Sequence, residues 1–95
     1  MSAYLIFIRD KLKDPGEIAV YGSLARASME AHSMERLVAY GELEVLEGDP
    51  AEGVIIFKFA DMAAARAWFF SPEYQKSIEY RMRGAEYRVL LADGV

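Results

Sequence analysis

A single histidine, together with a few tyrosines and arginines, offers the side chains of this sequence best suited to chemistry. Histidine is the residue type that most readily moves a proton near neutral pH, so His32 is the candidate general base. Tyr21 precedes it by eleven residues, which at about 100° per residue places both on nearly the same side of one helix. Two interpretations stay open: polar groups at the two ends of a cleft between helix and sheet, or a core tyrosine and a histidine favoured by the helix dipole.

A second group of candidates surrounds Arg81. Tyr74, Ile78 and Arg81 follow one another at spacings of four and three, so they share a helix face and Arg81 is expected to lean toward the core. The other cations nearby are Lys76, Arg83 and Arg88. Two interpretations of these cations are open. They form a patch that binds anions or nucleic acid with the help of stacking aromatic rings, or they form a helix end that is exposed to solvent. The net negative charge of the chain favours the exposed helix end. Trp68 is expected to serve in packing.

Several kinds of catalytic and metal site are excluded by what the chain lacks. It has no cysteine, which removes disulfides, thiolate metal sites and cysteine nucleophiles. One histidine cannot form a histidine-rich metal site, and only His32 is available to bind a haem iron. Ser28 lies four residues before His32, but a serine nucleophile also needs an orienting acid and an oxyanion hole, and neither is recognised. We therefore expect no metal and no cofactor.

The composition indicates one folded domain over residues 1–95. Hydrophobic residues make up 54% of the chain and charged residues 27%, which suits a packed core and excludes a disordered chain. The net charge of −4 argues against a nucleic-acid partner or an anionic membrane. No targeting segment and no stretch of membrane-spanning length are recognised, so we expect a cytoplasmic protein.

The pattern of apolar residues and capping signals predicts the element order β-α-β-β-α-β. The strands are expected near 4–8, 37–46, 54–59 and 86–92, and the helices from Pro15 to about His32, over 62–70 and over 72–83. Asp14 and Ser71 are expected N-caps, and Ser71-Pro72 breaks the second helix. This order predicts an α+β, ferredoxin-like fold with a four-stranded antiparallel sheet, whose central strands are the first and the third.

Both central strands are apolar on both faces, although the helices of such a fold cover only one face. In the first strand, one face carries Tyr4, Ile6 and Ile8 and the other carries Ala3, Leu5 and Phe7. In the third strand, Val54 and Ile56 lie opposite Ile55, Phe57 and Phe59, so one apolar face of the sheet is left without cover. Leaving about five such side chains in water would forgo on the order of 10 kcal/mol, which approaches the net stability of a small domain. We therefore predict a homodimer that packs through this sheet face. Cover by loops or by the chain ends is the alternative.

Several segments resemble the family known as domain of unknown function 1330. The resemblance rests on Gly41–Asp49, on Ala64–Trp68, and above all on Ser71–Gln75 together with Arg81, and it spans nearly the whole chain. It implies a bacterial, intracellular, ferredoxin-like subunit of the dimeric α/β-barrel superfamily, in which two sheets face each other across a two-fold axis. That superfamily includes cofactor-free monooxygenases, isomerases and haem-binding enzymes, so the fold does not decide the activity.

The tyrosine and arginine candidates match recurring positions of that family, and His32 matches a position that is often histidine. The chain departs from the family pattern in the second strand, where Ala39-Tyr40-Gly41 replaces an arginine followed by two glycines. The missing arginine removes an anion-binding group. The missing glycine places a side chain where the backbone would otherwise approach a ligand closely.

Two functions remain open. In the first, the chain binds or converts a small, mostly apolar, oxygenated molecule in a cleft between helices and sheet, without a cofactor. His32 is then the general base or a polar anchor, and Arg81 stabilises an enolate or carboxylate. The ligand-binding residues of this hypothesis are Tyr21, Tyr74, Arg81 and Trp68. In the second, the homodimer is a non-catalytic structural or regulatory module, and Arg81 pairs with an acid such as Glu73 or Glu86.

Overall fold

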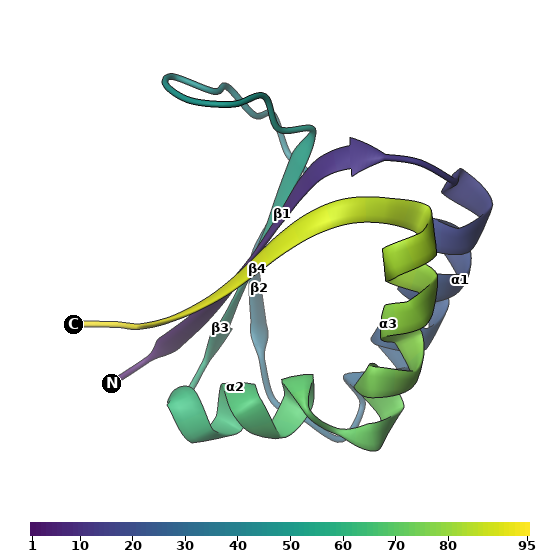
Figure 1. Ribbon diagram of the computed structural model, residues 1–95. Coiled ribbons are helices and arrows are strands. Elements are labelled where there is room, and N and C mark those ends of the chain that lie inside the picture. Colours follow the sequence, from purple (N-terminus) through teal and green to yellow (C-terminus); the bar gives the residue numbers. More distant parts are fainter.

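Strands and helices follow one another in the expected order in the computed structural model, which describes all residues 1–95. The elements are β1 (Ala3–Leu12), α1 (Pro15–Ser28), β2 (Glu35–Ala39), β3 (Gly53–Phe59), α2 (Met62–Phe69), α3 (Pro72–Gly84) and β4 (Ala85–Asp93). The strands form one antiparallel sheet in the order β2-β3-β1-β4, so the prediction of central first and third strands is confirmed. The helices lie on one side of the sheet and leave the other side open (Figure 1). The fold is α+β and ferredoxin-like.

The helices begin at the capping residues that the sequence predicts. Asp14 Oδ1 accepts a hydrogen bond of 2.9 Å from the backbone N–H of Gly16 at the start of α1. Ser71 Oγ accepts a hydrogen bond of 3.2 Å from the backbone N–H of Tyr74 at the start of α3. These bonds satisfy N–H groups that the first turn of a helix leaves unpaired. Ser71 also separates α2 from α3, which confirms the predicted break in the second helix.

Trp68 lies at the centre of the core and is fully buried. The centre of its ring lies 4.3 Å from that of Tyr74 and 5.6 Å from that of Phe57. Its Nε1 donates a hydrogen bond of 3.0 Å to Ser28 Oγ, and Ser28 in turn donates to a backbone carbonyl of its own helix. The Ser28 hydroxyl is therefore engaged in the core, and it makes no hydrogen bond to His32.

The first helix is shorter than predicted, because α1 ends at Ser28 and not near His32. The N–H of Met29 bonds to the carbonyl of Arg26, and the N–H of His32 bonds to the carbonyl of Met29. Both bonds reach back three residues instead of four, which tightens the chain into turns and ends the α-helix. His32 consequently does not continue the helical stripe on which Tyr21 lies.

The second strand is also shorter than predicted, because β2 ends at Ala39 although the alternation of apolar residues continues to Leu46. Tyr40 has a φ of 57°, in the left-handed region that strand backbone does not adopt. The chain leaves the sheet at this point. The segment Gly41–Ala51, which we call the arm, bends away from the side on which the helices lie (Figure 1).

The open side of the sheet is apolar at its centre. Ile6 of β1 lies between Ile56 of β3 and Leu90 of β4 in the sheet register, and Ile8 lies beside Val54. Leu90 is 48% exposed, and the other four are only partly covered. The two-sided apolar character read from the sequence is thus present in the structure. None of the helices combines the length and apolar character that crossing a membrane requires.

Candidate functional site

A cavity of about 520 Å³ lies between α1 and the sheet. It exists because α1 packs chiefly on α3 and stands off from the strands below it. Most of its walls are apolar, and its polar lining residues are Tyr21, Tyr40, Tyr87, Ser23, Arg26 and Arg36. A hollow of this size, with few polar groups in an apolar lining, is typical of sites for small molecules.

Arg81 lies beside this cavity without a counter-ion. It is only 6% exposed and forms no ion pair, so the predicted lean toward the core is confirmed and the alternative pairing with Glu73 or Glu86 is wrong. Its guanidinium carbon lies 5.9 Å from the ring centre of Tyr21 and 5.6 Å from that of Tyr87, and both rings line the cavity. Its Nε is buried and has no hydrogen-bond partner.

Two pairs of tyrosine hydroxyls accompany this arginine. Tyr21 Oη and Tyr74 Oη lie 2.8 Å apart, and the hydroxyls of Tyr40 and Tyr87 form a second hydrogen bond. In each pair one hydroxyl donates to the other, so one O–H is left that can donate to a ligand. Burial raises the pKa of Tyr21, Tyr40 and Tyr74 above the ordinary value. These phenols are neutral near pH 7 and act as hydrogen-bond donors, not as bases.

Tyr40 is held against the cavity by an unusual local structure. It is the only residue other than glycine with a positive φ. Its ring lies so close to Gly53 that a Cβ there would stand 2.5 Å from it. The guanidinium carbon of Arg9 lies 4.7 Å from the centre of the same ring, and Glu52 Oε1 lies 3.6 Å from Arg9 Nε. Backbone conformations of this kind cost energy and concentrate at functional sites.

Replacing Tyr40 with glycine is expected to leave the protein more stable than replacing it with alanine. Both changes remove the ring, but only glycine adopts the left-handed conformation without a steric cost of about 1–2 kcal/mol. In a domain of this size each kcal/mol shifts the Tm by roughly 4–8 °C, which thermal unfolding monitored by circular dichroism resolves. Ala39→Gly, one residue earlier in β2, is the control and should lower the Tm. Equal Tm values for the two Tyr40 variants would show that the left-handed conformation at this position carries no steric cost.

Three of the five predicted site residues come together in the structure, namely Tyr21, Tyr74 and Arg81. Of these three, only Tyr21 lines the cavity, and the buried Tyr74 and Arg81 lie behind its ring. Trp68 touches this group from the core, with its ring against Tyr74, but it is fully buried and does not line the cavity. His32 is partly buried beyond the end of α1 and is not among the lining residues either. A general base must reach the proton that it removes. The catalytic role of His32 therefore stays a prediction.

Sequence reasoning did not single out Arg26 and Arg36, which line the cavity from α1 and β2 and form no ion pair. It noted Tyr40 only as a departure from a family pattern. That departure was the available signal, since an aromatic residue at a glycine position must place its ring somewhere. Arg26 follows the lining residue Gly22 at helical spacing, which was a weaker signal. No group of three or more side chains that could hold a metal ion is present.

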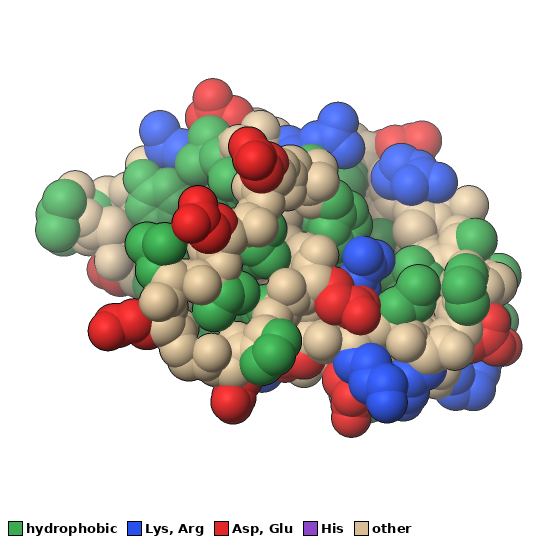
Figure 2. All heavy atoms as spheres, turned by 90° about the horizontal axis from the view of Figure 1, so that it is seen from above, with side chains coloured by type: hydrophobic (Ala, Val, Ile, Leu, Met, Phe, Trp, Pro, Cys, Tyr) green, Lys and Arg blue, Asp and Glu red, His purple; other side chains and the backbone are tan.

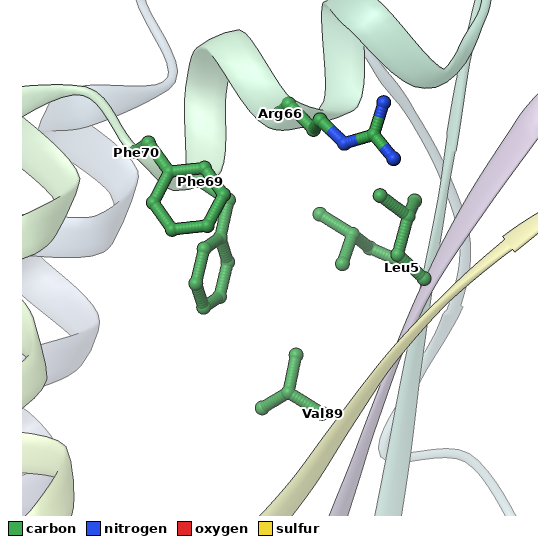
Figure 3. A pocket seen from close by; sticks show the side chains of 6 residues that line it. Leu5, Arg66, Phe69, Phe70 and Val89 are labelled. Atoms are coloured by element: carbon green, nitrogen blue, oxygen red, sulfur yellow. The ribbon is translucent and has the colours of Figure 1, made fainter.

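A second, smaller cavity of about 250 Å³ lies between α2 and the strands β1 and β4 (Figure 3). Phe69 and Phe70 approach it from the end of α2, Leu5 and Val89 approach it from the strands, and Arg66 lies at its edge. It offers no hydroxyl group and only this one cation. The cavity under α1 combines apolar walls with several donors and is therefore the stronger candidate site.

Solved structures share this fold at low sequence identity. A protein of unknown function from Rhodopseudomonas palustris superposes with a TM-score of 0.71 at 17% identity, over 99% of this chain and 82% of that one. The cofactor-independent oxygenase SnoaB from Streptomyces nogalater gives 0.66 at 14% identity, over 99% and 93%. A dimeric ferredoxin-like protein of unknown function from Thermobifida fusca gives 0.65 at 10% identity, over 99% and 92%. At these identities the likeness shows the fold alone.

Comparison with protein families gives one match along the sequence. A family model described as a domain of unknown function, DUF1330, matches residues 2–95. No curated protein matches the sequence at a significant level. The function must therefore be argued from the side chains of the site.

Proposed function

Because the chain belongs to the DUF1330 family, which is defined as a domain of unknown function, we propose its function from the site itself. The cavity under α1 binds a small, mostly apolar molecule that carries an anionic or strongly polarised oxygen. Arg81 and the neighbouring tyrosine hydroxyls hold that oxygen, while the apolar walls hold the rest of the molecule. The observation that carries this proposal is the buried Arg81 without a counter-ion.

A buried guanidinium without an anionic partner is costly, since removing one ion from water costs several kcal/mol. A ligand carboxylate or enolate would supply the missing charge. Guanidinium donors and phenol hydroxyls that are fixed in advance stabilise such an oxygen more strongly in a low-dielectric cavity than in water. Because Tyr21 and Tyr74 are neutral donors, this group of residues can hold a negative charge but does not itself remove a proton.

Catalysis without a cofactor is the finer part of the proposal. The same donors would stabilise an enolate that forms when a proton is removed next to a carbonyl group. His32 is the only histidine that could take this proton, and it must approach the cavity to do so. The fold that the chain shares with a cofactor-independent oxygenase is compatible with such chemistry but does not assign it.

Self-association through the open sheet face is the second part of the proposal. Structural neighbours from Thermobifida fusca and Bacteroides fragilis are described as dimeric. In this chain the apolar row Ile6, Ile56 and Leu90 provides the surface for such a contact. This surface equally supports the alternative of a non-catalytic homodimeric module. The expectation of a cytoplasmic location stays a prediction.

Binding of 1-naphthoate and of its neutral counterpart 1-naphthamide tests the ligand proposal. The wild-type protein is expected to bind the carboxylate more tightly than the amide, as measured by calorimetric titration. Arg81→Met should weaken naphthoate binding by at least about tenfold, because a hydrogen bond to a charged group contributes about 1.5–3 kcal/mol. Binding of the amide should change little.

Arg66→Met is the matched control, because Arg66 lies at the other cavity and the substitution is the same. This variant should bind both probes as the wild type does. The Tm of Arg81→Met should not fall, since methionine replaces an unpaired buried charge with an apolar side chain. Equal naphthoate affinity in the wild type and Arg81→Met would refute the assigned role of Arg81. An absence of binding across a panel of aromatic acids and ketones would favour the non-catalytic module.

A further inference from the structure

The arm makes no backbone hydrogen bond to any part of the chain along its whole length. Its two ends are nevertheless fixed. The N–H of Tyr40 donates to the carbonyl of Val54 at 3.0 Å, and the N–H of Glu52 donates to the carbonyl of Arg9 at 2.8 Å. The arm therefore presents a row of unpaired donors and acceptors from an anchored position. Strand edges of this kind are templates for pairing with another chain.

The side chains of the arm follow the pattern of a strand with one apolar side. Leu43 and Val45 alternate with Glu42 and Glu44. Leu43 is 39% exposed and Val45 is 42% exposed, so the chain covers the apolar side of the arm only in part. None of the acids of the arm forms an ion pair. Seen from above, acidic side chains stand out among hydrophobic ones on this part of the surface (Figure 2).

The arm is continuous with the open face of the sheet. It bends toward the side of the sheet that the helices leave free (Figure 1). Arg88 of β4 forms an ion pair of 2.9 Å with Asp10, which is the main cause of the raised pKa of that arginine, and the negative charge of Asp49 in the arm adds a smaller contribution. Arg88 lies beside Ile8 in the sheet register, at the end of the open face. A protein surface that packs on the open face would therefore contact the arm as well.

We propose that the arm pairs as an added strand with a second copy of this chain, with Leu43 and Val45 packed against that copy. The inference rests on the proposed self-association and adds an element to it, because the interface then includes backbone pairing as well as the apolar sheet face. Strand addition satisfies the unpaired groups of the arm, and alternate side chains give the contact its specificity. Two-fold symmetry makes the contact twice in each dimer.

The double variant Leu43→Asp/Val45→Asp tests this inference. Each change places a carboxylate in the apolar contact, and the loss of two buried side chains should weaken the dimer by at least about a hundredfold. Sedimentation velocity over a concentration series measures this. Circular dichroism shows whether the variant is folded. Glu42→Ala/Glu44→Ala alters the other side of the same segment and should leave the dissociation constant within about threefold.

Hydrogen exchange of the arm amides provides a second measurement that does not depend on a variant. The amides of residues 42–46 should be protected at concentrations where the wild type is a dimer and should lose this protection on dilution to the monomer. A folded double variant with wild-type dimer affinity, or unprotected arm amides in the dimer, would overturn the inference alone. A wild-type chain that is a monomer at every concentration would overturn the proposed self-association together with it.

Discussion

Trp68→Ala is expected to lower the free energy of unfolding by about 3–5 kcal/mol, a large share of the roughly 5–15 kcal/mol that a small domain possesses. The reason is the position of the ring. It is fully buried, it packs between β3 and α3 against Phe57 and Tyr74, and its Nε1 donates the hydrogen bond that satisfies the buried Ser28. Alanine would leave a cavity, and the buried Ser28 hydroxyl would lose the hydrogen bond that it accepts while keeping the one that it donates. Urea unfolding followed by far-UV circular dichroism measures the loss.

Phe70→Ala is the matched control for this change. Phe70 stands two residues later and is 67% exposed, so its truncation should cost less than about 1 kcal/mol. Trp68→Phe should fall between the two, because it keeps an aromatic ring and loses the hydrogen bond. A loss below about 1 kcal/mol in Trp68→Ala would mean that the core does not depend on this ring as described.

Ile6→Asp is expected to convert the proposed dimer to a monomer at micromolar concentration. Ile6 lies at the centre of the open face, between Ile56 and Leu90, and two-fold symmetry introduces the carboxylate twice. Burying an isoleucine contributes about 1.5–3 kcal/mol, so two copies weaken the dimer by at least about a hundredfold before the burial of charge is counted. Light scattering after size-exclusion chromatography distinguishes the two states.

Val20→Asp controls for the general effect of an added carboxylate. Val20 is an exposed apolar residue of α1, on the side of the molecule that carries the helices, and its substitution should leave the dimer intact. Ile6→Asp should remain folded by circular dichroism, because the core on the other face of the sheet is unchanged. If Ile6→Asp kept the dissociation constant of the wild type, the two copies would have to meet through another surface.

The parts of the fold that follow from local chemistry were predictable from the sequence. Asp14 and Ser71 cap helices because a short polar side chain can satisfy free N–H groups wherever the next residues form a helix. The central position of β1 and β3 follows from the handedness of the connections. The buried position of Arg81 was readable from its spacing to Tyr74, since both belong to one uninterrupted helix.

The parts that depend on backbone conformation could not be predicted in this way. The alternation through Leu43 and Val45 looks the same whether a strand pairs within the chain or leaves it, and the positive φ of Tyr40 leaves no trace in that periodicity. The position of His32 was extrapolated along a helix whose last bonds reach back only three residues. The cavity itself results from the distance between α1 and the sheet, which no pattern of residues encodes.

Helix α1 forms one wall of the cavity and is attached to the rest of the molecule chiefly through α3. Of its residues, only Ala25 belongs to the buried hydrophobic core, and its main packing partner is α3 and not the sheet. Side chains on its inner surface, such as Ile18 and Arg26, can therefore be exchanged with small effect on the packing around Trp68. Mutations on the inner surface of α1 can therefore change which compound the cavity accepts, while the core around Trp68 keeps its packing.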